Sequence, residues 1–185
     1  MKNNILFALF FFTLVVPSLG MASGEDLKSP FKHQMLVTET PEHTVRSFLY
    51  WYRKNIKRLN SIQLVEQTQA PAKPYSVNKN NVAIYISELR KSGFFGEKFL
   101  ASVEYYISIC DANLLKIKQT EGPPEGFDMD MVLLMQDYEN DFLHLDKAKS
   151  VYLTKTKVKL TFASENFLVF RLAQTKGKWF IQSIE

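Results

Sequence analysis

The segment at 127–141, FDMDMVLLMQDYEND, marks the point where the pattern of the chain changes. Helical patterns precede it, and strand patterns follow it. Its five apolar residues at 131–135 are bounded by acidic residues at 128 and 130 on one side and at 137, 139 and 141 on the other. An apolar run of this length between charges predicts a short strand or a buried turn that enters a sheet.

Three helices are predicted before this segment. Thr40 is a suitable N-cap and Pro41 fits the first helical position. Apolar side chains then recur at helical spacing over 45–59. They are Val45, Phe48, Leu49, Tyr52, Ile56 and Leu59. Similar stripes predict helices at about 81–92, ended by Gly93, and at about 97–115.

Strands are predicted after the segment. Val158, Leu160 and Phe162 alternate with polar residues, as in a strand with one buried face. Further strands are expected at 151–154, 166–173 and 179–184, and the last two are joined by a turn that contains Gly177. Helices first and strands last indicate an α+β domain, with about three N-terminal helices packed on an antiparallel sheet.

The strand at 166–173 is apolar on both alternations. Leu168 and Phe170 lie on one side, and Phe167 and Val169 lie on the other. When one face of an antiparallel sheet is in water, that face usually carries polar residues. Something is therefore expected to cover Phe167 and Val169. The cover is another element of the chain, a ligand or a second subunit.

The N-terminus has the pattern of a secretory signal peptide at 1–22. Lys2 precedes an apolar stretch at 5–16, and small residues follow, with cleavage expected after Gly20 or Ala22. A flexible leader is predicted at 23–39 and a single domain at 40–185, exported to the periplasm or secreted. Lys2 is the only charged residue of 1–22, so its removal lowers the net charge from +4 to +3, and no nucleic-acid partner is expected. Cys110 is the only cysteine, which excludes an internal disulfide.

Asp128 and Asp130 are paired carboxylates that suit a divalent cation or acid–base chemistry. Val132 and Leu133 stand where a calcium loop needs a ligand and a glycine, so that motif is absent. The structural alternative is that one Asp caps a turn and the other is solvated. Gln136 and Asp137 are expected to tie the loop to the sheet by hydrogen bonds.

No metal site, cofactor or catalytic group is predicted. The three histidines, at 33, 43 and 144, have no metal-ligand spacing. Cys110 lies on the apolar stripe of the third helix and is expected in the core.

The spacing of Asp128, Asp130, Gln136 and Asp137 resembles that of the DUF3828 family of exported bacterial proteins, in the NTF2-like (cystatin-like) superfamily. Met131 departs from the family pattern, which has a proline soon after the second Asp. The resemblance implies a long first helix lying in a curved sheet, with a cone-shaped cavity between them. It also implies dimers formed through the sheet face.

The expected function is that of an exported, non-catalytic binding or interaction module. The cone, which is either open or filled by aromatic side chains, or the outer face of the sheet would hold a small apolar ligand or a protein partner. The residues expected to line the pocket are Tyr52, Tyr106, Phe170 and Trp179. One specific version is a periplasmic immunity protein that inhibits a toxin. The alternative is an NTF2-like isomerase or hydrolase that uses a carboxylate at the cone mouth. No membrane span is expected after signal cleavage.

Overall fold

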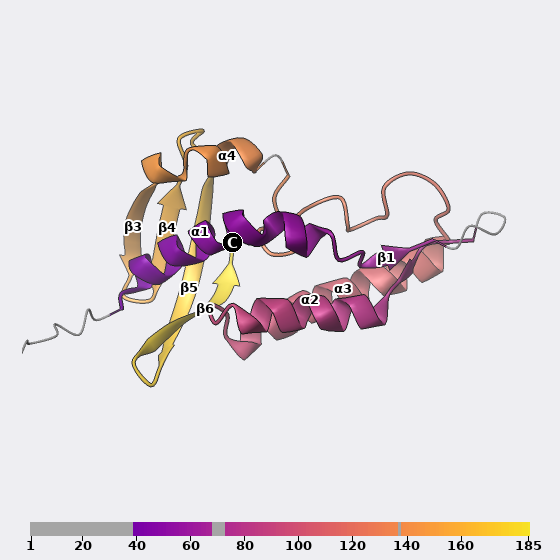
Figure 1. Cartoon of the computed structure of the whole chain (residues 1–185), viewed down its shortest axis with the longest axis horizontal. Helices are drawn as coiled ribbons and strands as arrows, with labels where there is room; N and C mark the ends of the chain where they lie inside the picture. Colours follow the sequence, from indigo (N-terminus) through magenta and orange to yellow (C-terminus); the bar gives the residue numbers. More distant parts are fainter. Residues whose placement is uncertain (1–38, 68–72, 137) are drawn as a thin grey trace, which may run out of the picture. The chain divides into compact units, whose positions relative to one another are not determined.

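The computed structural model describes residues 39–67, 73–136 and 138–185 (Figure 1). The chain divides into two units, Met1–Leu36 and Val37–Glu185, and all the described residues belong to the second. The signal peptide predicted at 1–22, nearly all of the leader predicted at 23–39, and Asp137 lie outside the described residues.

The described part of the chain is mixed helix and antiparallel sheet, which confirms the α+β class. Its helices are α1 (Pro41–Asn60), α2 (Lys79–Lys91), α3 (Glu97–Ile117), the short α4 (Glu139–Leu143) and a 3-10 turn, η1 (Leu145–Lys147). Its strands are β1 (Val65–Glu66), β2 (Ser76–Val77), β3 (Lys149–Thr154), β4 (Lys157–Thr161), β5 (Phe167–Thr175) and β6 (Lys178–Ile184). The sequence patterns predicted α1 to α3 and β3 to β6, and they missed α4, η1 and the small β1–β2 pair.

Helix α1 begins as its sequence predicts. The Thr40 Oγ1 accepts a hydrogen bond from the backbone N–H of His43 at 3.1 Å, which satisfies one of the free donors of the first turn. The predicted apolar stripe is the buried face, and Phe48, Leu49 and Tyr52 have no exposed surface. Burial of each such side chain contributes about 1.5–3 kcal/mol, so this face anchors the fold.

The main sheet has the strand order β3-β4-β5-β6, with every pair antiparallel. Val158 pairs with Phe170 and Leu160 with Leu168, which places these four buried side chains on the inner face. The β6 edge is covered at one point, because Phe95 forms a parallel bridge with Ile181. The Ile181 N–H donates to the Phe94 carbonyl at 2.8 Å, and the Gly96 N–H donates to the Ile181 carbonyl at 2.9 Å. Within the described chain, β3 pairs with β4 alone.

Helix α1 lies across the inner face of this sheet and contacts β4 and β6 (Figure 1). The Phe48 ring lies 6.0 Å from that of Phe170 and 5.1 Å from that of Phe95, both in edge-on contacts. Tyr52 and Phe170 have no exposed surface. Aromatic side chains therefore fill the space between α1 and the sheet, where the resemblance implies a cone-shaped cavity.

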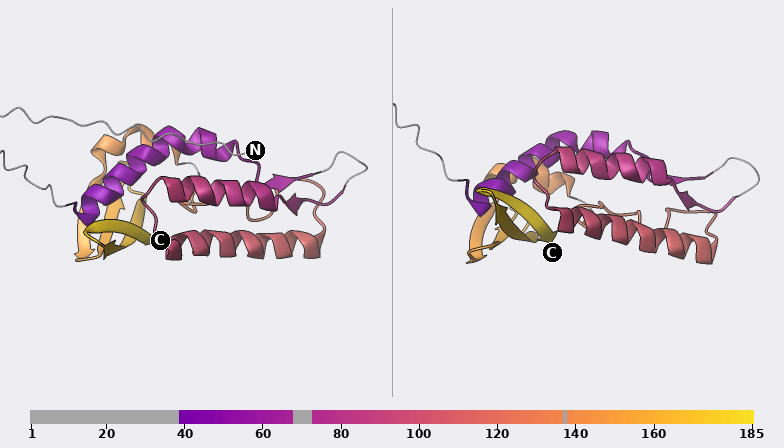
Figure 2. Two further views of the ribbon diagram at one scale, coloured as in Figure 1. Left: turned by 60° about the horizontal axis from the view of Figure 1, so that its bottom comes forward. Right: turned by 90° about the horizontal axis from the view of Figure 1, so that it is seen from below.

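Helices α2 and α3 pack side by side (Figure 2). Asn78 caps α2, and its Oδ1 accepts from the Asn81 N–H at 3.0 Å, so the helix begins two residues before its predicted start. Helix α3 also contacts β2 and β6. These helices join the small β1–β2 pair to the main sheet.

The apolar run at 131–135 forms a buried turn, but this turn does not enter the sheet as predicted. The Leu134 N–H donates to the Asp130 carbonyl at 2.9 Å, and the Asp130 N–H donates to the Met135 carbonyl at 3.1 Å. Val132 and Leu133 are buried, while Leu134 is exposed and has a φ of 52°. The run thus caps the core without joining the sheet.

The loop that leads into this turn packs tightly on α3. Gly126 has a φ of +82°, and a Cβ added there would lie 2.5 Å from the Cys110 Sγ. Cys110 is 4 % exposed, as expected for a core thiol, and burial raises its pKa. Glycine is required at this point both by the backbone conformation and by the close approach to Cys110.

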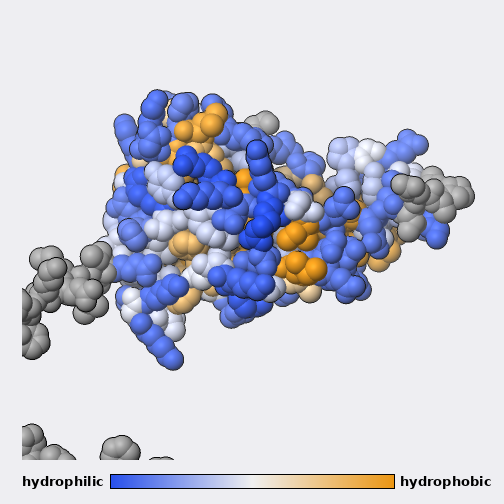
Figure 3. Space-filling model, viewed as in Figure 1, coloured by the Kyte–Doolittle hydropathy of each residue, from blue (hydrophilic) through white to orange (hydrophobic). Residues whose placement is uncertain are grey.

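Among the residues that the structure describes, no helix combines the length and the apolar character needed to cross a bilayer. The face shown in Figure 3 is mostly hydrophilic, with hydrophobic side chains in small groups near its centre and at its top.

Candidate functional site

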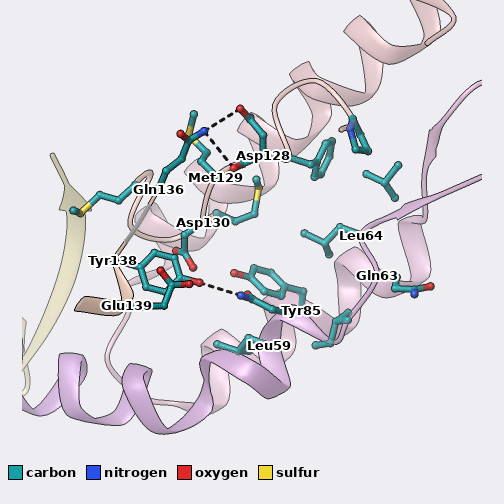
Figure 4. Close-up of a pocket in the computed structure, with 17 residues that line it drawn as sticks. Leu59, Gln63, Leu64, Tyr85, Asp128, Met129, Asp130, Gln136, Tyr138 and Glu139 are labelled. Carbon is teal, nitrogen blue, oxygen red and sulfur yellow. Dashed lines mark hydrogen bonds between the residues drawn. The ribbon is translucent and has the colours of Figure 1, made fainter. Parts of the chain in front are cut away.

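A cleft of about 580 Å³ opens between the end of α1, the β1 region, α2 and the segment at 124–139 (Figure 4). Ligand pockets in proteins occupy about 300–1,000 Å³, so its size suits a small molecule. The residues that line it are Leu59, Asn60, Ile62, Gln63, Leu64, Val65, Tyr85, Pro124, Phe127, Asp128, Met129, Asp130, Met131, Met135, Gln136, Tyr138 and Glu139. Three of the four motif residues identified in the sequence are therefore in one cleft.

Asp130 is the most enclosed charged residue of the cleft, with 7 % of its surface exposed. Its Oδ1 accepts hydrogen bonds from the backbone N–H groups of Val132 at 2.9 Å and Leu133 at 2.8 Å. The Tyr52 hydroxyl donates to the carboxylate, at 2.8 Å from Oδ1 and 2.7 Å from Oδ2. Asp130 thus caps the buried turn and joins it to α1, 78 residues earlier in the chain.

Burial raises the pKa of the Asp130 carboxyl, while the hydrogen bonds from Leu133, Tyr52 and Val132 act in the opposite direction. Desolvation penalises the charged form of any carboxyl, and donors to the carboxylate favour it. In this residue desolvation is the larger effect. Asp130 is therefore a carboxyl with a raised pKa at the edge of an open cleft.

Three tyrosines surround this carboxyl. Tyr52 and Tyr85 are buried, and burial raises the pKa of each hydroxyl. Tyr138 is half-buried, and its hydroxyl accepts a hydrogen bond from the Asn60 side-chain amide at 3.2 Å. The hydroxyls of Tyr85 and Tyr138 point toward Asp130 across the cleft (Figure 4). At neutral pH the hydroxyls of Tyr52 and Tyr85 stay protonated, and a hydroxyl can donate or accept.

Asp128 and Gln136 are exposed at the mouth of the cleft. The Gln136 Nε2 donates to the Asp128 Oδ2 at 3.1 Å and to the Asp128 carbonyl at 3.4 Å. Gln136 therefore closes the loop on itself and makes no bond to the sheet, contrary to expectation. The two aspartates are placed as in the structural alternative, since Asp130 caps a turn and Asp128 is solvated.

The four residues expected to line a pocket are not brought together by the fold. Tyr52 and Phe170 are fully buried in the core, and neither lines the cleft. Tyr106 lies on a separate groove of about 320 Å³ along α3, and Trp179 packs partly buried against the core. These residues were chosen from apolar stripes, which identify buried faces. Because protein interiors are close-packed, a buried face is where a cavity is least expected.

Sequence reasoning missed the residues that form the sides of the cleft. Leu64 follows α1, Tyr85 is on α2, and Tyr138 precedes α4. They are distant in sequence and follow no common period. The only sequence signal close to the site was the spacing of the aspartates.

Two arginines of α1 form hydrogen bonds within the domain. Arg46 donates to the Ala148 carbonyl at 3.1 Å and to the Ser150 hydroxyl at 2.9 Å. Arg53 donates to the Phe142 carbonyl at 3.0 Å. His43 and His144 are exposed, and in the described ranges no three His, Cys, Asp or Glu side chains gather as metal ligands would.

The outer face of the main sheet is only partly covered. Val169 is 8 % exposed, whereas Phe167 is 51 % exposed, with the Lys159 Nζ 3.9 Å from the centre of its ring. Val151, which pairs with Lys159 on the same face, is 60 % exposed. The cover expected over Phe167 is not supplied by another described element of the chain.

Comparison of the chain with protein-family models, with curated proteins and with solved structures finds no match.

Proposed function

We propose that the unit at 37–185 is a non-catalytic binding module that holds a small molecule in the cleft at Asp130. The observation that carries the proposal is the lining of this cleft. Leu59, Leu64, Phe127 and three methionines offer apolar contact, and Asp130 with its tyrosines offers a few converging polar groups. Ligand sites combine apolar contacts with placed polar groups, and this lining offers both, with slightly more polar than apolar surface.

The alternative location, between α1 and the main sheet, is filled by side chains. Phe48, Tyr52 and Phe170 occupy it and have no exposed surface. Opening it would remove aromatic contacts that contribute about 0.5–1.5 kcal/mol per pair beyond the burial of area. The cleft needs no such rearrangement, and it is the better site for a ligand.

The test is native mass spectrometry of the protein purified from the cells that produce it. We expect an adduct of small-molecule mass that is lost on denaturation. A Leu64→Trp variant, which places a larger ring in the cleft, should lack the adduct. A Leu115→Trp variant is the matched control, because Leu115 is 61 % exposed on α3 and does not line the cleft. An adduct of equal intensity in both variants would show that the ligand binds elsewhere.

Export and the relation to the NTF2-like superfamily belong to the same proposal. The apolar segment at 5–16, followed by small residues, supports export to the periplasm. The α+β arrangement and the Asp128, Asp130 and Gln136 spacing support a DUF3828-like fold. Inhibition of a toxin stays a prediction. Cell fractionation and an experimental structure would test the first two points.

A second candidate, an enzyme that transfers a proton at Asp130, is favoured by one observation. A carboxyl with a raised pKa at an open cleft is the arrangement used by general acids and bases. Turnover of a substrate, abolished in an Asp130→Asn variant that still binds it, would support this function. Binding without turnover would support the binding module.

The protein-partner version is favoured by two exposed apolar side chains on the outer sheet face, Val151 on the edge strand β3 and Phe167 on the inner strand β5. We propose a second copy of this chain as the occupant. Sedimentation of wild type and of a Phe167→Glu variant tests it, since only the wild type should form the dimer. A wild type that is monomeric at all concentrations would overturn this version.

A further inference from the structure

The charges that line the cleft all have one sign. Asp128, Asp130 and Glu139 are acidic, and no Lys, Arg or His lines the cleft in the part of the chain that the structure describes. The chain as a whole is basic, with 23 Lys and Arg against 19 Asp and Glu. The cleft therefore has a charge opposite to that of the protein around it.

We propose that the ligand of this cleft is an organic cation, an ammonium group attached to an apolar or aromatic body. The inference rests on the proposed function and adds the chemical class of the ligand. An anionic ligand would face three carboxylates with no compensating cation from the lining, and like charges brought together in a binding site are strongly unfavourable.

Asp130 has free acceptor capacity for such a head group. Its Oδ1 accepts from Val132, Leu133 and Tyr52, whereas its Oδ2 accepts only from Tyr52 among the described residues. A carboxylate oxygen has about two acceptor sites. An ammonium N–H can therefore bond to Oδ2 without displacing the bonds that hold the turn.

The tyrosines complete a site for a donor. The hydroxyls of Tyr85 and Tyr138 point into the same space as the Asp130 carboxylate (Figure 4). A hydroxyl oxygen accepts hydrogen bonds, so an ammonium group with three donors would find three acceptors there. Asp128 and Glu139, both exposed at the mouth, would raise the local concentration of cations and speed their entry.

The body of the ligand would lie against the thioethers and the aromatic ring of the lining. Met129, Met131 and Met135 are flexible and polarisable, and they adapt to irregular apolar shapes. Phe127 adds an aromatic surface, and aromatic faces attract cations within about 6 Å. A cation with an aromatic body fits this combination better than a small inorganic cation, which prefers a shell of oxygen ligands.

The test uses three probes with one body and different head groups: tryptamine, tryptophol and indole-3-propionate. Their affinities for the purified protein are measured by isothermal titration calorimetry. We expect tryptamine to bind at least about tenfold more tightly than tryptophol, because a charge about 5 Å from a carboxylate is attracted at an effective dielectric constant of about 20. Indole-3-propionate should bind more weakly than either.

Two variants assign the effect to Asp130. Asp130→Asn keeps an oxygen acceptor for the turn and removes the charge, so the affinity for tryptamine should fall about tenfold and that for tryptophol should change little. Asp146→Asn, on an exposed acidic residue that does not line the cleft, is the control and should leave both unchanged.

The outcomes separate the two proposals. If tryptophol or indole-3-propionate binds as tightly as tryptamine, and Leu64→Trp abolishes that binding, the cation inference is wrong and the cleft proposal stands. If none of the probes binds, or if Leu64→Trp leaves binding unchanged, both are overturned.

Discussion

Replacement of Asp130 by alanine should destabilise the protein far more than the same change at an exposed acidic residue. Asp130→Ala leaves three donors without their acceptor: the Tyr52 hydroxyl and the backbone N–H groups of Val132 and Leu133. Each buried donor left unpaired costs about 1–3 kcal/mol. Water from the cleft can bond to some of these donors. The mutation also removes a carboxylate whose burial is unfavourable, and this offsets part of the loss of stability. We therefore expect a decrease of about 3 kcal/mol in the free energy of unfolding.

Urea denaturation followed by tryptophan fluorescence measures this change. With a slope of about 2 kcal/mol per M, the midpoint should fall by about 1.5 M. Asp130→Asn keeps an oxygen acceptor for the turn and should cost about 1 kcal/mol. Asp128→Ala, on an exposed residue bonded only to Gln136, should stay within about 0.5 kcal/mol of wild type. Equal midpoints for Asp130→Ala and Asp128→Ala would refute the capping role of Asp130.

The pH dependence provides a second measurement on the same residue. Burial raises the pKa of Asp130 in the folded state above its unfolded value of about 3.9, so the folded protein binds more protons between these two values. The contribution of Asp130 to stability is full below pH 3.9 and is lost as the pH rises through the folded pKa. The raised pKa values of Tyr52, Tyr85 and Tyr138 keep those groups out of this range. The penalty of Asp130→Asn should therefore be larger at pH 4 than at pH 7, and a penalty that grows toward pH 7 would contradict this assignment.

Two further stability predictions have matched controls within the chain. Gly126→Ala should lower the thermal midpoint more than Gly177→Ala, because both have a positive φ but only the first would place its Cβ against Cys110. Equal shifts would show that the contact with Cys110 is unimportant. Phe170→Ala should cost about 3–5 kcal/mol in urea, since the ring is fully buried, whereas Phe167→Ala, at a half-exposed ring, should cost much less. A small effect at Phe170 would mean that the core beneath α1 is not close-packed.

The elements that could be predicted are those whose sequence contains a regular spacing of apolar residues together with a residue that marks a boundary of the element. In α1, the Thr40–Pro41 cap predicts where the helix starts and the apolar stripe predicts its buried face. Both predictions agree with the structure. In β4, the alternation of Val158 and Leu160 with lysines gave the strand and its inner face. The α+β class followed from such local signals.

The candidate site depends on contacts that no local pattern contains. Asp130 reaches Tyr52 across 78 residues, and Tyr85 approaches from a third element. Helix α4 has five residues, too few to show a helical period. A pocket was expected at Tyr52 and Phe170 because both lie on apolar stripes, but such stripes predict buried side chains and not cavities. The cleft lies at the C-terminal end of α1 and beside Tyr85 of α2.

The two edges of the main sheet differ, and this difference limits how copies of the protein can associate. The backbone at 94–96 bonds to the β6 edge at Ile181, whereas the outer edge of β3 has no described partner. A free edge is a template for pairing with another chain. Pairing of the β3 edges of two molecules would occupy both of these edges and form a closed two-fold dimer. In the described chain the bridge between Phe95 and Ile181 obstructs pairing along the β6 edge, so growth of the main sheet into an open fibre through β6 is disfavoured.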